Sequence, residues 1–366
     1  MSVRSPNRRR MRASSVLSEA WRNFASGTSR TLLVALLAVV VLGGIAAADV
    51  RTIVGLSAQA TQFRESGAAV HVLTATDAIS GQRCDALGSL PGVLGAGASR
   101  QAGEQATFLT APRSGITAIE ATGGLAGVLG IADGTGAGAW FSDEAAKALG
   151  ATVGTTLPTS LGPATVTALY PYPDDASDRS LAYATITPVP STGDFDSCWV
   201  LAWPPSPVTE SLIRATYDGD PADQSSATFV QLNTRLGAEF DGPKMFDDRA
   251  TALAPLVAAL FGLVFGVGII WARRLELASA LHAKVPKAAL VTQVWLELLA
   301  MMIAAVVITL PFTYFLAAQG NPDPLWPAWS AGLRVVAAGA LSTLIGGVLT
   351  AAATSEERLF RYFKDR

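Results

Sequence analysis

The sequence has 366 residues, of which 50% are hydrophobic and only 15% charged, and its mean hydropathy is +0.36. These values argue against a chain that is soluble throughout and are typical of a membrane protein that also carries a soluble domain. Residues 1–30 carry seven Arg against one Glu, a net +6, whereas residues 51–245 carry ten Lys or Arg against nineteen Asp or Glu, a net −9. This asymmetry is the one that the positive-inside rule produces, and we expect no nucleic-acid partner.

The first apolar segment, residues 31–50, follows the basic segment 1–30. A bilayer core about 30 Å thick needs roughly 20 apolar residues of helix, so this segment predicts a first crossing with residues 1–30 in the cytoplasm. The small residues Ala46-Ala47-Ala48 also resemble a signal-peptide cleavage site. The apolar stretch is longer than a usual signal segment, and cleavage would leave three crossings, so an uncleaved helix is favoured.

The middle region, residues 51–248, is long enough for one or two compact domains and is predicted to lie outside the cell. Residues 51–65 contain one Gly and no Pro, which favours a helical continuation of the first crossing. Strand and helix patterns then alternate, and Ser142–Leu149 has a helix-start serine and strong helix formers closed by Gly150. The mixture predicts an α+β domain.

The chain has two cysteines, Cys84 and Cys198, and both fall in this region. An even pair in an oxidising compartment favours a disulfide, and closing so long a loop contributes on the order of 4–5 kcal/mol in the chain-entropy model. Two separate buried thiols are the alternative.

Three further apolar segments lie in the region 249–366, at about 252–271, 288–318 and 329–353. The link between the first two of these is basic, whereas the link 319–328 has no basic residue. With four crossings, the basic links all face the cytoplasm, together with both termini. The sequence therefore predicts an α-helical protein of the plasma membrane with four crossings and an α+β domain inserted between the first and the second.

Glu297 and Arg334 are ionisable residues within or near the apolar segments. Charge within a membrane is costly, so each needs a functional or structural reason. Snorkelling accounts for Arg334 near the outer end of its segment. Glu297 needs a helix–helix hydrogen bond or a position facing a partner. A proton pathway would need a second intramembrane acid.

Catalytic signatures are absent from the sequence. The two histidines, His71 and His282, fall on opposite sides of the membrane in this topology, and no clustered Cys/His spacing, catalytic serine motif or Walker A motif occurs. We therefore expect no catalytic residue, no metal site and no cofactor on this chain.

Four stretches resemble the FtsX-like or MacB-like family of ABC permeases. Ser18–Phe24, containing Glu19, Trp21, Arg22 and Asn23, is similar to the family's amphipathic helix before the first crossing. Ala148–Gly154 resembles a turn of its periplasmic core domain. Arg273–Leu277 resembles its cytoplasmic RRxE link, and Val294–Leu299 resembles the segment that carries a glutamate near the start of its third crossing.

The resemblance implies a permease that pairs with a second permease subunit, the same or related, and with two cytoplasmic ATP-binding subunits. ATP and Mg would then be bound by the partner ATPase. The link after the second crossing would dock on that ATPase, with Arg273, Arg274, Glu276, Lys284 and Lys287 as the contact residues. The complex would export or extract a peptide, lipid or lipoprotein, or transmit force to an extracytoplasmic partner.

Two departures from the family pattern concern the coupling segment and the helix packing. Lys284 stands where the link usually has glycine, and the third crossing lacks the family's glycine repeats and carries Pro311. A different class of function, a membrane receptor or sensor with an extracellular ligand-binding domain, needs neither the RRxE link nor an ATPase partner.

Overall fold

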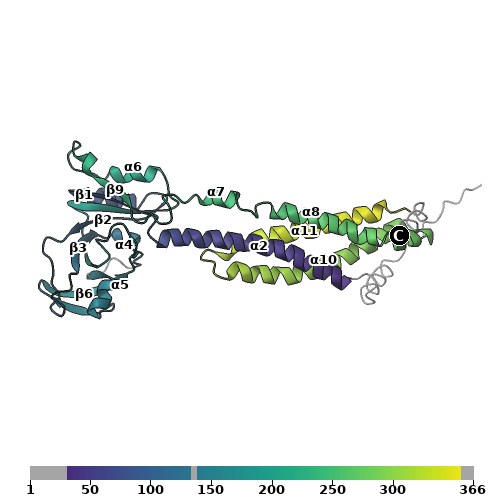
Figure 1. Ribbon diagram of the computed structural model, residues 1–366, viewed down its shortest axis with the longest axis horizontal. Helices are drawn as coiled ribbons and strands as arrows, with labels where there is room; N and C mark the ends of the chain where they lie inside the picture. Colours follow the sequence, from purple (N-terminus) through teal and green to yellow (C-terminus); the bar gives the residue numbers. More distant parts are fainter. Residues whose placement is uncertain (1–30, 133–137, 356–366) are drawn as a thin grey trace, which may run out of the picture. The chain divides into compact units, whose positions relative to one another are not determined.

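The computed structural model describes residues 31–132 and 138–355 (Figure 1). The chain divides into two compact units. We call the residues up to Ala58 together with those from Pro243 onward the helical unit, and Gln59–Gly242 the inserted domain. The inserted domain is narrower than the predicted 51–248 because the first long helix runs through the expected boundary at residue 50.

The helical unit is built from long apolar helices joined by short links. Four helices in the described part of the chain are long and apolar enough to cross a membrane. They are α2 (Thr31–Glu65), α8 (Ala254–Ala272), α10 (Lys287–Ala318) and α11 (Leu325–Ala353), with the shorter α7 (Gly242–Asp247) and α9 (Arg274–His282) beside α8 in sequence. The predicted crossings are therefore found within a few residues of their expected bounds, and α2 continues to Glu65 as the helical pattern of 51–65 indicated.

Glycines allow α8 and α11 to pack against each other at backbone contact. A methyl group at Gly262 would overlap the carbonyl oxygen of Gly339, and one at Gly266 would overlap that of Thr343. Gly346 of α11 faces Leu263 of α8 equally closely. Small residues at such spacing are how membrane helices approach closely without a hydrophobic driving force. The glycine repeats missing from the third crossing are thus found in the second and fourth.

The inserted domain is an α+β domain around a mixed sheet. Its described strands are β1 (Val70–Ser80), β2 (Val93–Gln101), β3 (Thr117–Thr122), β4 (Ala139–Ser142), β5 (Thr156–Thr159), β6 (Gly162–Tyr170), β7 (Ala184–Val189), β8 (Asp194–Ala202) and β9 (Thr228–Gln231). They are ordered β5-β6-β4-β7-β3-β2-β8-β1-β9. The pairs β3–β7 and β4–β6 are parallel, and the others are antiparallel.

Short helices connect these strands, and α5 confirms the helix predicted over Ser142–Leu149. The described helices are α3 (Gly81–Leu87), α4 (Leu125–Val128), α5 (Asp143–Leu149), α6 (Val208–Arg214) and the 3₁₀ turn Gln224–Ser226. Ser142 caps α5 by accepting a hydrogen bond from the Ala145 N–H, and Gly150 ends it with φ 61°.

The predicted disulfide is present. Cys84 of α3 is bonded to Cys198 of β8, with their Cα atoms 5.8 Å apart and a sequence separation of 114. Both residues are fully buried. The bond therefore ties α3 to a central strand of the sheet, within the core that β1, β2 and β8 share.

Candidate coupling site

Arg273 occupies the junction between α8 and α9. It follows the last residue of α8 and precedes the first of α9, and its backbone N–H bonds to the carbonyls of Ile270 and Trp271. Its backbone geometry, φ −99° and ψ 9°, breaks the helix for one residue. The side chain can therefore reach the α9 side and the α10 side of the junction together.

The Arg273 guanidinium is shared by two glutamates. Its Nε and Nη2 donate to the two carboxylate oxygens of Glu276, both at 3.0 Å, and Nη1 donates to Glu297 at 2.5 Å. Burial alone would lower the pKa of Arg273, but the hydrogen bonds to Glu276 and the charge of Glu297 outweigh it and raise the pKa. The cation is therefore fixed between α9 and α10.

Glu297 is the buried member of this network. Its side chain is 3% exposed, against 14% for Arg273 and 58% for Glu276. The Gln293 amide, one helical turn away, also donates to the Glu297 carboxylate at 3.2 Å. The charge that the sequence places within an apolar helix is thus paired with Arg273, the residue that follows α8. A hydrogen bond within the protein was one of the two explanations that the sequence left open for Glu297.

The end of α9 is a Schellman motif in which Lys284 takes the position usually given to glycine. The Lys284 N–H bonds to the carbonyl of Leu281, and the Val285 N–H bonds to that of Ala280. Lys284 adopts φ 64°, a conformation that glycine adopts without steric cost. The departure noted at this position in the sequence is therefore a strained helix end, and Pro286 then caps the start of α10.

The predicted contact residues divide into two groups. The Arg273 guanidinium is already bonded to Glu297 of the same chain, and the Arg274 guanidinium lies 4.1 Å from the centre of the Trp271 ring. Lys284 and Lys287 are exposed. Arg273, Arg274 and Glu276 lie at the start of α9, whereas Lys284 and Lys287 follow its end. The direct contact of any of the five with an ATPase stays a prediction.

The other predicted residues lie apart from this junction or outside the described residues. Arg334 is exposed on the third turn of α11. Glu19, Trp21, Arg22 and Asn23, the residues of the predicted amphipathic helix, fall outside the described residues.

The sequence analysis missed a second buried ion pair, Asp49–Arg249. The Arg249 Nε donates to Asp49 of α2 at 3.2 Å, and the side chains are 10% and 1% exposed. Arg249 also bonds the Phe246 carbonyl and lies over its ring. The sequence contained a signal for this pair, because Asp49 lies inside the first predicted crossing. Like Glu297, it is a charge within an apolar helix and therefore needs a partner.

The two pairs hold α8 at both of its ends. Arg249 precedes α8 and pairs with α2, whereas Arg273 follows α8 and pairs with α10. The 19 residues of α8 span about 28 Å at helical rise. The helix is therefore fixed to a different neighbour at each end and packs along α11 in between.

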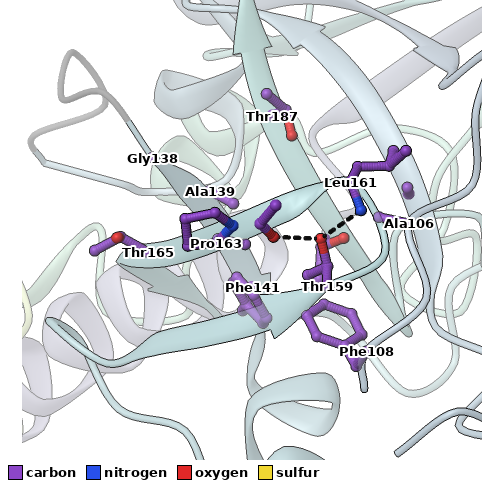
Figure 2. A pocket seen from close by; sticks show the side chains of 14 residues that line it. Ala106, Phe108, Gly138, Ala139, Phe141, Thr159, Leu161, Pro163, Thr165 and Thr187 are labelled. Atoms are coloured by element: carbon purple, nitrogen blue, oxygen red, sulfur yellow. Dashed lines mark hydrogen bonds between the residues drawn. The ribbon is translucent and has the colours of Figure 1, made fainter. Parts of the chain in front are cut away.

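The inserted domain has a hollow of about 430 Å³ on the β3–β7–β4–β6 part of its sheet (Figure 2). Its walls are small apolar residues, phenylalanines and threonines. Figure 2 shows the Thr159 hydroxyl already engaged, because it donates to the Gly162 carbonyl and accepts from the Leu161 N–H. The hollow has no charged side chain in its lining, and no group of three or more metal-ligating residues occurs in the described residues.

These features define a multi-pass membrane protein with an α+β domain inserted between its first and second membrane-spanning helices. No protein-family model matches the sequence, and neither does any curated protein. Among solved structures, the chain is similar to the crystal structure of the periplasmic region of MacB from Actinobacillus actinomycetemcomitans. The TM-score is 0.34 and the identity 11%, over 46% of this chain and 91% of that one.

Proposed function

We propose that this chain is the permease subunit of an ATP-driven complex. Two cytoplasmic ATP-binding subunits bind ATP and Mg, and a second permease subunit completes the assembly in the plasma membrane. The charge distribution supports an orientation with the α9 junction in the cytoplasm and the acidic inserted domain outside. The cargo is a peptide, lipid or lipoprotein, or the complex transmits force to an extracytoplasmic partner.

The observation that carries this proposal is the fixing of α9 to both flanking helices. A short helix between two crossings could hang freely from the membrane, but Arg273 ties it to α10 through Glu297. Leu277 of α9 is buried in an apolar core to which α10 contributes, and Ala278 is buried as well. A force applied to α9 therefore moves α8 and α10 together.

The outward surface of α9 and its following turn is the docking face in this proposal. His282, Lys284 and Lys287 are exposed there. An ATPase surface with acidic residues would complement these basic side chains. The buried Arg273 then acts as the linkage behind the contact and not as the contact itself.

Motion received by α9 has a continuous path along α8. The backbone contact between α8 and α11 leaves no room for one helix to slide past the other in small steps. At the other end of α8, Arg249 passes the motion to α2 through Asp49. Since α2 and the segment before α8 both lead by the chain into the inserted domain, ATP-driven closure would move that domain.

The test is a pull-down from mild detergent of the tagged chain, co-expressed with its neighbouring genes, followed by an ATPase assay. Lys284→Glu combined with Lys287→Glu reverses the docking charges and leaves the Arg273 network intact. Arg113→Glu, a reversal on the exposed surface of the inserted domain, is the control. We expect an ATPase that co-purifies with wild type and control and is lost from the double variant.

Two results would contradict this proposal. An ATPase that binds wild type and double variant equally well would show that Lys284 and Lys287 do not form the docking face. A chain that purifies alone, with no ATPase activity in any fraction, would favour the receptor or sensor alternative.

A further inference from the structure

Arg334 is an exposed cation on α11, a helix whose other side chains are apolar or uncharged. By the 3.6-residue repeat it lies on the side opposite Gly339, which packs against α8, and it shares its side with Leu341 and Ile345. Leu341 is 59% exposed and Ile345 is 54% exposed. Because α11 is long and apolar enough to cross a membrane, this face is turned either to lipid or to another protein.

The packing of α8 against α11 sets the depth of Arg334. The backbone contacts of Gly262 and Gly266 with α11 advance in the same direction along both helices, so the helices are parallel, and their register places Arg334 level with Val257. The 19 residues of α8 span about 28 Å, close to the roughly 30 Å of a hydrocarbon core. Since α8 begins at Ala254, Arg334 lies about 5 Å inside the boundary, within reach of a snorkelling arginine.

Within the described residues, Arg334 has no carboxylate partner. The four long helices contain Asp49, Glu65 and Glu297 as their acids. Asp49 and Glu297 are buried and bonded to other arginines. Glu65 lies about 24 Å beyond Asp49 along α2 at helical rise, so it is far from the depth of Arg334. The anion for this cation must therefore come from outside the chain.

A second copy of the chain does not supply that anion. Two copies that pair in one membrane about an axis along the bilayer normal place equal residues at equal depth. Contact through the exposed face of α11 would bring the two Arg334 cations together, and like charges in contact oppose association. This face is therefore better suited to lipid than to a subunit interface.

We propose that Arg334 binds the phosphate of a membrane phospholipid, in the leaflet that the proposed orientation places outside. A guanidinium donates two parallel hydrogen bonds to a phosphate. Ser330, one turn nearer the boundary, is small and leaves room for the head group, and Trp326, a further turn out and 62% exposed, lies at head-group level. Leu341 and Ile345 would contact the acyl chain. The inference goes beyond the proposed function and needs no ATPase partner.

The experiment uses the full chain in nanodiscs of digalactosyldiacylglycerol, a bilayer lipid without phosphate. A small fraction of phosphatidylglycerol carries a photoreactive diazirine on its acyl chain near the glycerol. After illumination, mass spectrometry compares the labelling of residues 330–345 with that of residues 308–315 of α10. The α10 stretch is exposed, has no cation and lies at the same depth, because Thr313 is the neighbour of Gly332.

We expect the ratio of the two labelled stretches to be about tenfold higher for this probe than for photoreactive digalactosyldiacylglycerol, since only the phospholipid offers a charged acceptor. This comparison uses the wild-type chain and does not depend on the folding of any variant.

Variants locate the contact. Arg334→Leu should lower the ratio for the phospholipid probe about tenfold, whereas Arg334→Lys, which keeps the charge, should stay within about threefold of wild type. Leu341→Ala, on the same face but further from the boundary, is the matched control and should leave the ratio unchanged. Elution as a single species and retention of the Cys84–Cys198 bond report that each variant has folded.

Three results would overturn the proposal. The first is equal labelling ratios for the two probes on the wild-type chain. The second is a folded Arg334→Leu protein that the phospholipid labels as strongly as Leu341→Ala. The third is oxidative cross-linking of a Leu341→Cys variant into a dimer, which would place a second copy on this face. The new thiol is the only free one, because both native cysteines are bonded to each other.

Discussion

Replacing Arg273 with methionine removes the cation that Glu276 and Glu297 share. Methionine keeps much of the apolar stem and removes every donor, so the perturbation is mainly electrostatic. The Glu297 carboxylate, 3% exposed, would lose its hydrogen bond from Arg273. Because removing one partner of a buried ion pair is strongly destabilising, we expect this single change to be the most damaging at the junction.

The structure sets an order of magnitude for each variant. Removing one partner of a buried pair costs about 3–5 kcal/mol, which is the expectation for Arg273→Met. Glu297→Gln should cost about 1–3 kcal/mol, because Arg273 keeps both hydrogen bonds to Glu276. Glu276→Gln should cost less than about 1 kcal/mol, because that carboxylate is mostly exposed. Arg273→Met combined with Glu297→Leu should cost less than Arg273→Met alone.

Hydrogen exchange of α9 in nanodiscs measures the local opening free energy, and a free-energy loss of 3–5 kcal/mol corresponds to exchange about 140- to 3,700-fold faster. Exchange in peptides of the inserted domain is the internal control. Equal effects of Arg273→Met and Glu276→Gln would refute the assignment of Glu297 as the buried partner. A double variant as unstable as the sum of its singles would show that the two side chains do not interact.

Three further variants test the packing, the helix end and the disulfide. Gly266→Ala should destabilise the α8–α11 contact by about 1–3 kcal/mol. Gly268→Ala is the control, because a methyl group there meets open space, and it should be neutral or stabilising. Thermal unfolding in nanodiscs compares the two variants. Lys284→Gly should slow hydrogen exchange at the end of α9, because relief of its left-handed backbone stabilises by about 1 kcal/mol. Cys84→Ala combined with Cys198→Ala should lower the stability of the inserted domain by about 5 kcal/mol, measured by limited proteolysis, since the bond closes a loop of 114 residues.

The sequence predicted the elements whose signals are local. Apolar length identified the four long helices, and Ser142 with Gly150 marked both ends of α5. The cysteine pair needed only its number and compartment. Each of these depends on residues close together in the chain or on a simple count, and the structure confirms them.

What the sequence could not give is the identity of neighbours across the fold. Arg273 and Glu297 are 24 residues apart on different helices, and Asp49 and Arg249 are 200 apart. Each charge is visible in the sequence, but nothing local says which helix lies beside it. The order of the strands in the mixed sheet could not be predicted for the same reason, because strand pairing depends on packing between segments far apart in the sequence.

The separation of Asp49 from Arg249 also has a consequence for biosynthesis. At ordinary translation rates of about 5–20 residues per second, the ribosome needs about 10–40 s to make the intervening chain. During that interval the first helix holds an aspartate whose cation does not yet exist, while the whole inserted domain is being synthesised. A nascent chain that stalls before Arg249 therefore carries an uncompensated acid in its membrane helix, a mark by which quality-control proteases could distinguish unfinished chains from complete ones.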